Sequence, residues 1–268
     1  INQDPFDFSG LLGSYEYLDP IRLDTSGGSG PISVTFDISG LNNTIRETYS
    51  STTTISGEIY TTGEYIITAT NASSLNYNEA TVNETIIIDS GDQSEFYFVN
   101  IKSSYDYFST ITFTTRGGSG TGDVRFDISG LDNAVNNRIS GNTIQGYDVG
   151  IYKVIATKDG GDNFDDISIN FDFSINPIAQ GLFEPSGVFT SYPYKDTIYL
   201  DTSGGTDNGD VSFSLVSDTY GPINLVEGNR VEEDISVGLY TLTATKDGSL
   251  NYLDASFSID INVSQIGQ

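Results

Sequence analysis

Hydrophobic and polar residues alternate with a period of two along most of the chain, in short runs separated by turns rich in Gly, Asn, Asp and Ser. This alternation is typical of half-buried β-strands. Clear examples are residues 34–38, 124–128, 167–175, 211–215 and 257–263. No run of useful length carries the 3.6-residue spacing of an amphipathic helix. The pattern therefore predicts an all-β protein.

One of these strands occurs three times. The motif Gly-x-Tyr-x-apolar-x-Ala-Thr begins at Gly63, Gly150 and Gly238, so successive copies lie about 87 residues apart. This period is too long for one coil of a solenoid and suits a whole small domain. In each copy, a Ser-Tyr-x-Tyr segment and a strand that ends in a Gly-Gly turn precede the motif.

The repeat predicts three tandem domains of roughly seven short strands each, which favours antiparallel β-sandwiches. The boundaries fall best after Asp89 and Asn176. The predicted domains are residues 1–89, 90–176 and 177–268. The joins between them are too short to act as flexible tethers, so we expect a stiff tandem arrangement.

The position of the repeated tyrosine resembles the tyrosine corner of immunoglobulin-like (Ig-like) domains. There, a Tyr near the start of strand F lies two residues before the second Cys. The residues at this position are Tyr65, Tyr152 and Tyr240. The resemblance implies that they belong to the core of their domains. It also implies that three phenylalanines replace the core Trp of strand C, namely Phe36, Phe126 and Phe213.

The fuller motif continues into a turn that ends in Asn-Tyr or Asn-Phe. It is similar to Ig-like repeats found in tandem in bacterial and giant-virus surface proteins, and the resemblance covers nearly the whole chain. It implies a location outside the cell, on the cell surface or on a virion. The same module occurs in adhesins, fibres and enzyme spacers, so it indicates the fold more strongly than any one role.

The composition excludes several kinds of chemistry. The chain has no Cys, His, Met or Trp. Disulfides, thiolate zinc sites and Ser-His-Asp triads therefore cannot form. The 37 acidic residues make chance pairs of carboxylates certain, so such pairs do not single out a glycosidase. We expect no catalytic residues and no enzymatic activity.

The net charge is −26. It repels nucleic acid and anionic membranes. No apolar run approaches the roughly 18 residues of a membrane-spanning helix, so we expect no membrane insertion. The expected partners are other protein subunits, in a homo-oligomer or a larger surface assembly, and glycans are further candidates. Because the chain begins at Ile1 and not at Met, we expect a processed form or a piece of a longer protein.

An acidic turn in the second repeat has two interpretations. Its carboxylates could supply some of the six to eight oxygen ligands that Ca²⁺ takes. The alternative is a solvated turn, because the equivalent turns of the other repeats carry far fewer acids. Ca²⁺ is the one cofactor that the sequence suggests. The candidate ligands are Asp159, Asp162, Asp165 and Asp166.

Two further features concern the surface. Asn-x-Ser/Thr sequons mark candidate glycosylation sites, provided that the protein is made where N-glycosylation occurs. These are Asn42, Asn71, Asn83 and Asn262. The tyrosines of the Ser-Tyr-x-Tyr segments could stack on sugars, or could pack beneath the edge of the sandwich near the joint between domains.

These observations predict a non-catalytic structural repeat segment of a stalk, fibre or filament that acts as a spacer and assembly element. One alternative is an adhesin-type module that recognises a host glycan or protein, and another is an accessory region of a larger secreted enzyme. If the protein polymerises by β-augmentation, residues 6–8 and 262–265 are the candidate free edges.

Overall fold

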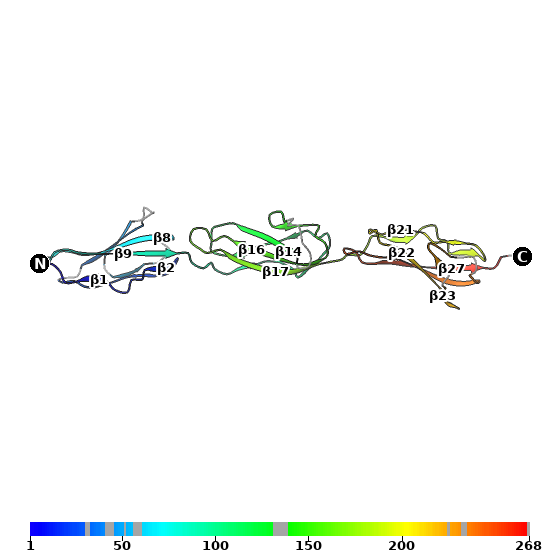
Figure 1. Ribbon diagram of the computed structural model, residues 1–268, viewed down its shortest axis with the longest axis horizontal. Coiled ribbons are helices and arrows are strands. Elements are labelled where there is room, and N and C mark those ends of the chain that lie inside the picture. Colours follow the sequence, from blue (N-terminus) through cyan, green and yellow to red (C-terminus); the bar gives the residue numbers. More distant parts are fainter. Residues whose placement is uncertain are drawn as a thin grey trace. The chain divides into compact units, whose positions relative to one another are not determined.

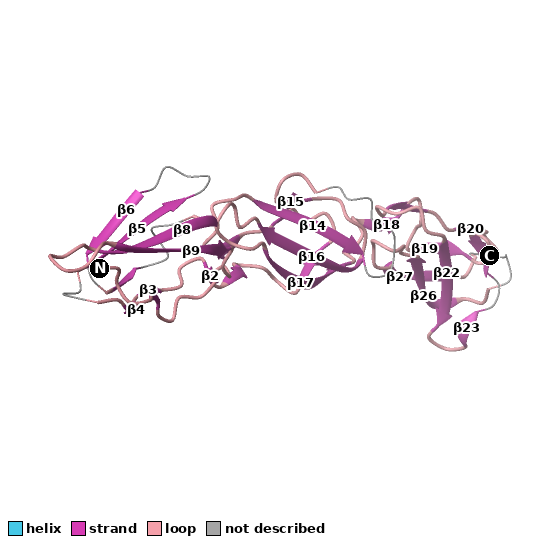
Figure 2. Cartoon of the chain, turned by 60° about the vertical axis from the view of Figure 1, so that its left-hand side comes forward, coloured by secondary structure: helices cyan, strands magenta, loops and turns pink. Residues whose placement is uncertain are grey.

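The computed structural model describes residues 1–29, 33–40, 46–50, 52–55, 61–130, 139–223, 226–231 and 235–266. Every regular element within them is a strand (Figure 2). This confirms the all-β prediction. The chain divides into two compact units, one formed by residues 1–101, 113–127 and 155–170, the other by residues 102–112, 128–154 and 171–268. The boundaries predicted after Asp89 and Asn176 lie inside these units, and the division into three domains stays a prediction.

The first unit contains a five-stranded sheet with the order β2-β9-β8-β5-β6. Its strands are β2 (Ser14–Glu16), β9 (Ala80–Asp89), β8 (Gly63–Asn71), β5 (Val34–Gly40) and β6 (Arg46–Ser50). The short strand β2 runs parallel to the end of β9. All other neighbours in the sheet are antiparallel.

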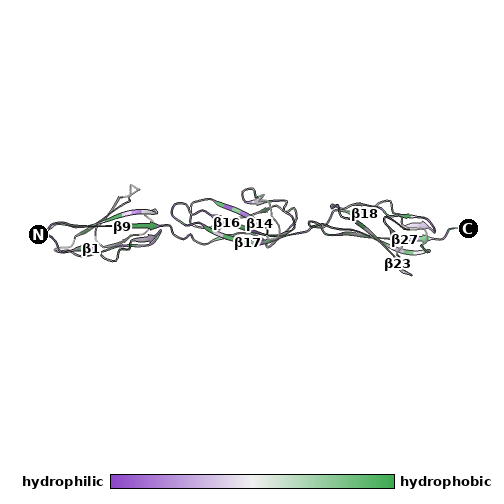
Figure 3. Ribbon diagram, viewed as in Figure 1, coloured by the Kyte–Doolittle hydropathy of each residue, from purple (hydrophilic) through white to green (hydrophobic). Residues whose placement is uncertain are grey.

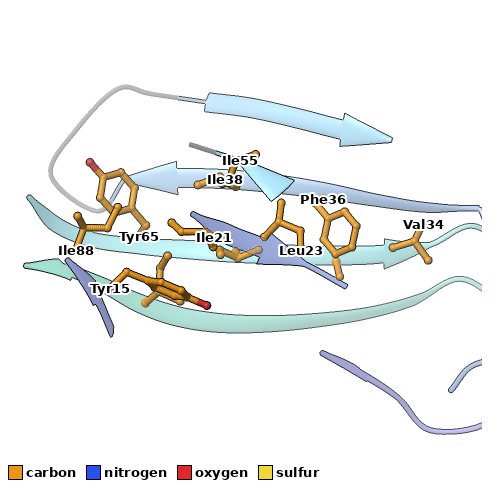
Figure 4. Packing of buried hydrophobic residues seen from close by; sticks show 12 residues of the cluster. Tyr15, Ile21, Leu23, Val34, Phe36, Ile38, Ile55, Tyr65 and Ile88 are labelled. Atoms are coloured by element: carbon orange, nitrogen blue, oxygen red, sulfur yellow. The ribbon is translucent and has the colours of Figure 1, made fainter. Parts of the chain in front are cut away.

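Shorter pairs complete the first unit. They join β1 (Phe6–Phe8) to β4 (Thr25–Gly27), β3 (Ile21–Leu23) to β7 (Thr53–Ile55), and β10 (Phe96–Phe98) to β13 (Thr115–Gly117). Figure 1 labels β1, β2, β8 and β9 of this unit. A hydrophobic core lies between the five-stranded sheet and the β3–β7 pair (Figure 4).

The order of these strands is that of an Ig-like sandwich. Strands β5, β8 and β9 occupy the positions of C, F and G in one sheet, whereas β3 and β7 occupy those of B and E in the other. The period-two pattern explains the packing, because Tyr65, Ile67 and Ala69 of β8 all point into the core and are buried.

The second unit repeats this arrangement. Its five-stranded sheet has the order β19-β27-β26-β22-β23, and β19 is again parallel to the end of β27. The strands are β19 (Ser191–Pro193), β27 (Ala255–Ser264), β26 (Gly238–Lys246), β22 (Val211–Ser217) and β23 (Gly221–Ile223). Hydrophobic residues gather in β27, as they do in β9 (Figure 3), and Ile261 and Val263 are buried in a second core.

The smaller sheets of the second unit pair β18 (Phe183–Pro185) with β21 (Thr202–Gly204) and β12 (Ile111–Thr112) with β15 (Thr143–Ile144). A three-stranded sheet has the order β20-β25-β24, with β20 (Ile198–Tyr199), β25 (Arg230–Val231) and β24 (Val226–Glu227).

A four-stranded sheet holds the second copy of the motif, in the order β11-β17-β16-β14. Strand β11 (Ser104–Asp106) runs parallel to β17 (Ile167–Asn176), and the other two are β16 (Gly150–Lys158) and β14 (Val124–Gly130). All three copies of the motif therefore form the strand in position F of a sheet with the same strand order.

The proposed free edge near the carboxyl end of the chain is wrong. Asn262 and Val263 pair with β26 on one side and with β19 on the other. These two residues therefore offer no free edge to a neighbouring subunit. Residues 6–8 form β1, which pairs with β4.

The Gly-Gly turns owe their first glycine to a close approach of two backbones. Gly27 has φ +80, and a Cβ atom built on it would lie 2.0 Å from the carbonyl oxygen of Pro5. At Gly117, with φ +85, a Cβ atom would lie 1.9 Å from the carbonyl oxygen of Glu95. Only glycine fits such a position, because it has no side chain and tolerates positive φ.

Candidate functional site

The three motif tyrosines make the same hydrogen bond. Each hydroxyl donates to the backbone carbonyl oxygen four residues earlier, at 2.8 Å for Tyr65, 2.7 Å for Tyr152 and 2.6 Å for Tyr240. Their exposed fractions are 2%, 5% and 1%. A buried tyrosine therefore ties the start of strand F to the turn before it, which is the geometry of a tyrosine corner.

Burial changes the acidity of two of these hydroxyls. It raises the pKa of Tyr152, and the nearby carboxylate of Asp148 and the ring of Tyr147 raise it further. Burial also raises the pKa of Tyr240, with a smaller contribution from Tyr220. Both hydroxyls therefore lose their protons less readily than a free tyrosine does.

The three phenylalanines assigned to the core of strand C differ in burial. Phe36 is fully buried, whereas Phe126 and Phe213 are only half-buried. Phe126 stacks on Phe113, which is buried, with ring centroids 6.1 Å apart. Phe213 packs against the edge of the second core. The position is thus apolar in all three copies but deeply buried in the first alone.

The two tyrosines of each Ser-Tyr-x-Tyr segment have different surroundings. The hydroxyl of the first accepts a hydrogen bond from the backbone amide three residues earlier, at 2.9 Å for Tyr15, 2.9 Å for Tyr105 and 2.8 Å for Tyr192. Tyr15 and Tyr192 are buried. The first tyrosine thus anchors its own loop, whereas the second is only half-buried, with Tyr17 and Tyr194 packed against the edges of the two cores.

In the first unit, the second tyrosine forms part of a contact between two predicted repeats, which we call joint 1. Its residues are Tyr17 and Thr62 of the first predicted repeat and Gly91, Asn163 and Phe164 of the second. Gly91 and Phe164 form a parallel β-bridge. In it, the Gly91 amide donates to the Asn163 carbonyl oxygen at 3.1 Å. The ring of Phe164 meets that of Tyr17 edge-on, with centroids 5.1 Å apart.

Side chains hold the same loop in place. The backbone amide of Thr62 donates to Asn163 Oδ1 at 3.2 Å, and the Thr62 hydroxyl donates to the carbonyl oxygen of Asp162 at 2.6 Å. The Ser90 hydroxyl donates to Asp165 Oδ1. Thr62 follows Thr61, whose carbonyl oxygen accepts the hydrogen bond from Tyr65. The tyrosine corner therefore positions the turn that receives the Asn.

The second unit contains an equivalent contact, joint 2, between Tyr107 and Val149 of the second predicted repeat and Ile178, Asn251 and Tyr252 of the third. Ile178 and Tyr252 form the parallel bridge, and the Ile178 amide donates to the Asn251 carbonyl oxygen at 3.2 Å. The Val149 amide donates to Asn251 Oδ1 at 2.9 Å. The rings of Tyr107 and Tyr252 meet edge-on, with centroids 5.6 Å apart.

Joint 2 has one additional interaction. Asn251 Nδ2 donates to Asp148 Oδ1 at 2.8 Å, and the carbonyl oxygen of Asp148 accepts the hydrogen bond from Tyr152. Burial raises the pKa of Tyr107, with contributions from Tyr252 and Asp148. The corner and the joint thus share a residue in this unit.

Sequence reasoning missed a glutamine that lies three residues before the first Phe of each repeat. Gln93 Nε2 donates to the carbonyl oxygens of Lys158 and Asp165, and Gln93 Oε1 accepts from the Gly120 amide. Gln3 and Gln180 bond the equivalent loops in the same way. Each glutamine therefore ties the start of its repeat to the loop that carries the joint Asn. Its identical offset from Phe6, Phe96 and Phe183 was the available signal.

The four acids of the candidate Ca²⁺ site are engaged in local interactions. Asp159 and Asp166 accept hydrogen bonds from the amides of Gly161 and Gly160, at 2.7 and 3.0 Å. Asp165 accepts from Ser90, and Asp162 takes part in joint 1 through its carbonyl oxygen. Within the described part of the chain, no three acidic side chains are grouped so as to hold a metal ion. The Ca²⁺ site stays a prediction.

The glycosylation candidates have different positions. Asn71 does not suit a glycan, because its side chain is fully buried and its Nδ2 donates to Gln3 Oε1 at 2.8 Å. Asn83 and Asn262 lie on the exposed faces of β9 and β27 and stay predictions. Asn42 lies outside the described residues.

No protein-family model matches the sequence, and no curated protein matches it. Several solved structures of tandem domains are similar to it. Domains from titin share 10% identity, covering 99% of this chain and all of the titin chain, with a TM-score of 0.35. The insect immune protein hemolin shares 12% identity over 98% of this chain and 76% of its own, with a TM-score of 0.34.

The three N-terminal domains of the outer capsid protein Hoc from bacteriophage RB49 share 8% identity, covering 98% of this chain and all of theirs, with a TM-score of 0.28. Among the described residues, no helix is long and apolar enough to span a membrane.

Proposed function

We propose that this chain is a non-catalytic spacer and assembly segment of an extracellular or virion-surface stalk, fibre or filament. The observation that supports the proposal is the recurrence of one contact, since joints 1 and 2 use the same backbone bridge, the same Asn and the same pair of aromatic rings. A chain whose specific contacts hold successive repeats together suits a role in which spacing and direction matter.

The chemistry of the chain agrees with this role. The hydroxyls of Tyr65, Tyr152 and Tyr240 are each used in the hydrogen bond of a tyrosine corner. The joint residues are used in contacts with one another. With no His or Cys in the sequence, the commonest general base and any thiol nucleophile are absent. The net charge of −26 favours solubility and disfavours nonspecific contact with anionic surfaces.

The decisive measurement is the rate of hydrogen exchange at the backbone amides of the joint. In Asn163→Ala, the Thr62 amide loses its acceptor, so we expect exchange of the Thr62 amide to rise about fivefold to tenfold, as the loss of one hydrogen bond implies. The matched control is Asn170→Ala, because Asn170 is an exposed residue of β17 outside the joint. Unchanged exchange in Asn163→Ala would mean that the joint does not hold the repeats.

The competing role, glycan recognition by an adhesin, is tested on the unmodified chain. A spacer should give a blank glycan array at concentrations at which the chain is soluble. Saturable binding to one class of sugar would replace the spacer proposal with an adhesin.

A further inference from the structure

The turn at the end of each Ser-Tyr-x-Tyr segment has an unusual residue at its third position. In each turn, a backbone amide donates to the carbonyl oxygen three residues earlier, at 3.0, 3.0 and 3.2 Å; the donors are Asp19, Ser109 and Asp196. The residue at the third position directly follows the second tyrosine of the segment and has a positive φ of 78°, 66° or 73°. These residues are Leu18, Phe108 and Lys195.

A side chain is unfavourable at such a φ. The left-handed conformation brings the Cβ atom of an L residue too close to a carbonyl oxygen, so turns that require it normally have Gly or Asn there. The rest of the described chain follows this rule, because its other residues with positive φ are glycines and Asn100. All three repeats thus keep a side chain where glycine would cost less, which indicates that the side chain is used.

Burial in a core does not explain these residues. Leu18 is 43% exposed and Phe108 is 55% exposed, and Lys195 is also exposed. Hydrophobic burial of this extent gives a side chain little reason to occupy a strained position. Their use therefore has to be found in a specific contact.

In the second and third predicted repeats, that contact is with the ring of the preceding tyrosine. The ring of Phe108 lies against that of Tyr107, with centroids 4.0 Å apart and planes at 42°. Lys195 Nζ lies 5.7 Å from the centroid of the Tyr194 ring, which is within the range of a cation–π interaction. Two different side chains at the same strained position thus make the same kind of contact.

The Tyr107 ring is the part of joint 2 that meets Tyr252. The backbone of Tyr107 is fixed, because its amide donates to the Asn176 carbonyl oxygen at 2.9 Å. Tyr252 directly follows Asn251, whose Oδ1 accepts from the Val149 amide. Rotation of the Tyr107 ring away from Tyr252 would therefore loosen the loop that supplies the Asn.

We propose that Phe108 is a positioning residue of joint 2, whose ring confines that of Tyr107 to the orientation that receives Tyr252. The positive φ is kept because it directs the Phe108 side chain onto this ring. The inference rests on the proposed function, since it assigns Phe108 a part in one of the joints on which that function depends.

The test is hydrogen exchange of the full chain with three substitutions of Phe108. In Phe108→Ala, exchange of the Val149 amide should rise about twofold to tenfold, the range that one aromatic pair contributes. Phe108→Tyr keeps a ring at the position and should exchange as wild type does. The Val99 amide, bonded to the Thr114 carbonyl oxygen elsewhere in the second repeat, should not change in either variant. A purely structural role would instead raise both exchange rates together.

Phe108→Gly distinguishes the ring from the backbone strain. It lacks the ring, so Val149 exchange should rise as in Phe108→Ala. It also lacks a Cβ atom at positive φ, so it should unfold at a higher urea concentration than Phe108→Ala does. If Phe108→Ala were the more stable of the two, the strain on which the proposal depends would be absent.

The titration of Tyr107 provides a spectroscopic measurement of the same ring. Burial raises its pKa, with contributions from Tyr252 and Asp148. In Phe108→Ala, the pKa of Tyr107, followed by NMR, should therefore move back towards the ordinary value of 10.0. The matched control is Phe189→Ala, because Phe189 is also exposed and its ring meets that of Tyr192 in the third repeat. This control should leave the Val149 amide and Tyr107 unchanged.

Wild-type Val149 exchange in Phe108→Ala would overturn the proposal, as would an equal rise in Phe189→Ala. Faster Thr62 exchange in Asn163→Ala would still support the proposed function in either case, so the two proposals can fail separately.

Discussion

Joints 1 and 2 make the same contact with different side chains. The backbone bridge, the Asn Oδ1 acceptor and the edge-on rings recur, although Gly91 is replaced by Ile178 and Thr62 by Val149. What is constant is therefore the interaction of the loop Asn with backbone groups, which does not depend on the identity of the residue that offers them. What differs is an additional side-chain bond, which the Thr62 hydroxyl donates to the Asp162 carbonyl oxygen in joint 1 and Asn251 Nδ2 donates to Asp148 Oδ1 in joint 2.

The largest expected effect comes from removing a corner tyrosine, and it distinguishes the contribution of the corner from that of the joint. Tyr152→Ala and Tyr240→Ala both empty a buried ring site, so each should lower the free energy of unfolding by about 3–5 kcal/mol. Tyr152→Ala should also speed amide exchange at Ile178, because Asp148 loses the hydrogen bond that positions it.

Urea unfolding and amide exchange measure the two effects. Tyr240→Phe and Tyr152→Phe are the controls, and each should cost only about 1 kcal/mol, since one hydrogen bond is lost without a cavity. If Tyr240→Ala melts like wild type, the buried ring of Tyr240 does not stabilise the core.

An intermediate effect should distinguish the two joints by charge. Asn251→Asp places a carboxylate beside Asp148, where an amide donated at 2.8 Å, so joint 2 should weaken by about 1–3 kcal/mol. Asn163→Asp keeps the acceptor for Thr62 and should change joint 1 far less.

Exchange of the Val149 and Thr62 amides measures joints 2 and 1 respectively. Lowering the pH through the carboxyl range should restore joint 2 in Asn251→Asp, because protonation removes the repulsion. Equal effects of the two substitutions would show that Asp148 contributes nothing specific.

The smallest effect concerns alkaline pH. The pKa of Tyr107 and of Tyr152 is raised above the ordinary value of 10.0 by burial and by neighbouring groups. The folded state thus holds these protons more tightly than the unfolded state does. Their contribution to stability is fully present below pH 10 and is lost as the pH rises through the folded-state pKa values.

Unfolding by urea at neutral pH and above about pH 10 checks this expectation. In Tyr152→Phe, the free energy of unfolding should fall less steeply as the pH rises. Tyr252→Phe should reduce this pH dependence slightly, because Tyr252 contributes to the raised pKa of Tyr107. The same substitution also gives joint 2 a Phe, as in joint 1. An unchanged slope in Tyr152→Phe would assign the alkaline loss to other residues.

The sequence could predict what is local to a strand. The alternation around Tyr65, Tyr152 and Tyr240 indicated strands with one buried face, because the period of two determines which side chains share a face. The same pattern could not tell how deeply a face is covered. Phe126 and Phe213 are therefore less buried than Phe36, since burial depends on the strands of the opposite sheet.

The joints could not be predicted in this way. Asn163 and Asn251 stood in the repeated motif, but their partners Thr62 and Val149 lie about a hundred residues earlier in the chain. A contact between two loops leaves no periodic signal. The glutamines did leave one, in the form of a constant offset from the first Phe, but their role depends on loops that only the folded chain brings together.

The parallel pairing of β2 with β9, and of β19 with β27, has a mechanical consequence. Each pair joins a strand near the beginning of a repeat to the strand at its end. Tension along the polypeptide pulls the two partners in opposite directions, so it acts across their hydrogen bonds and loads them together in shear. A repeat built this way resists stretching at the points where the backbone enters and leaves it, before the hydrophobic interior carries any force.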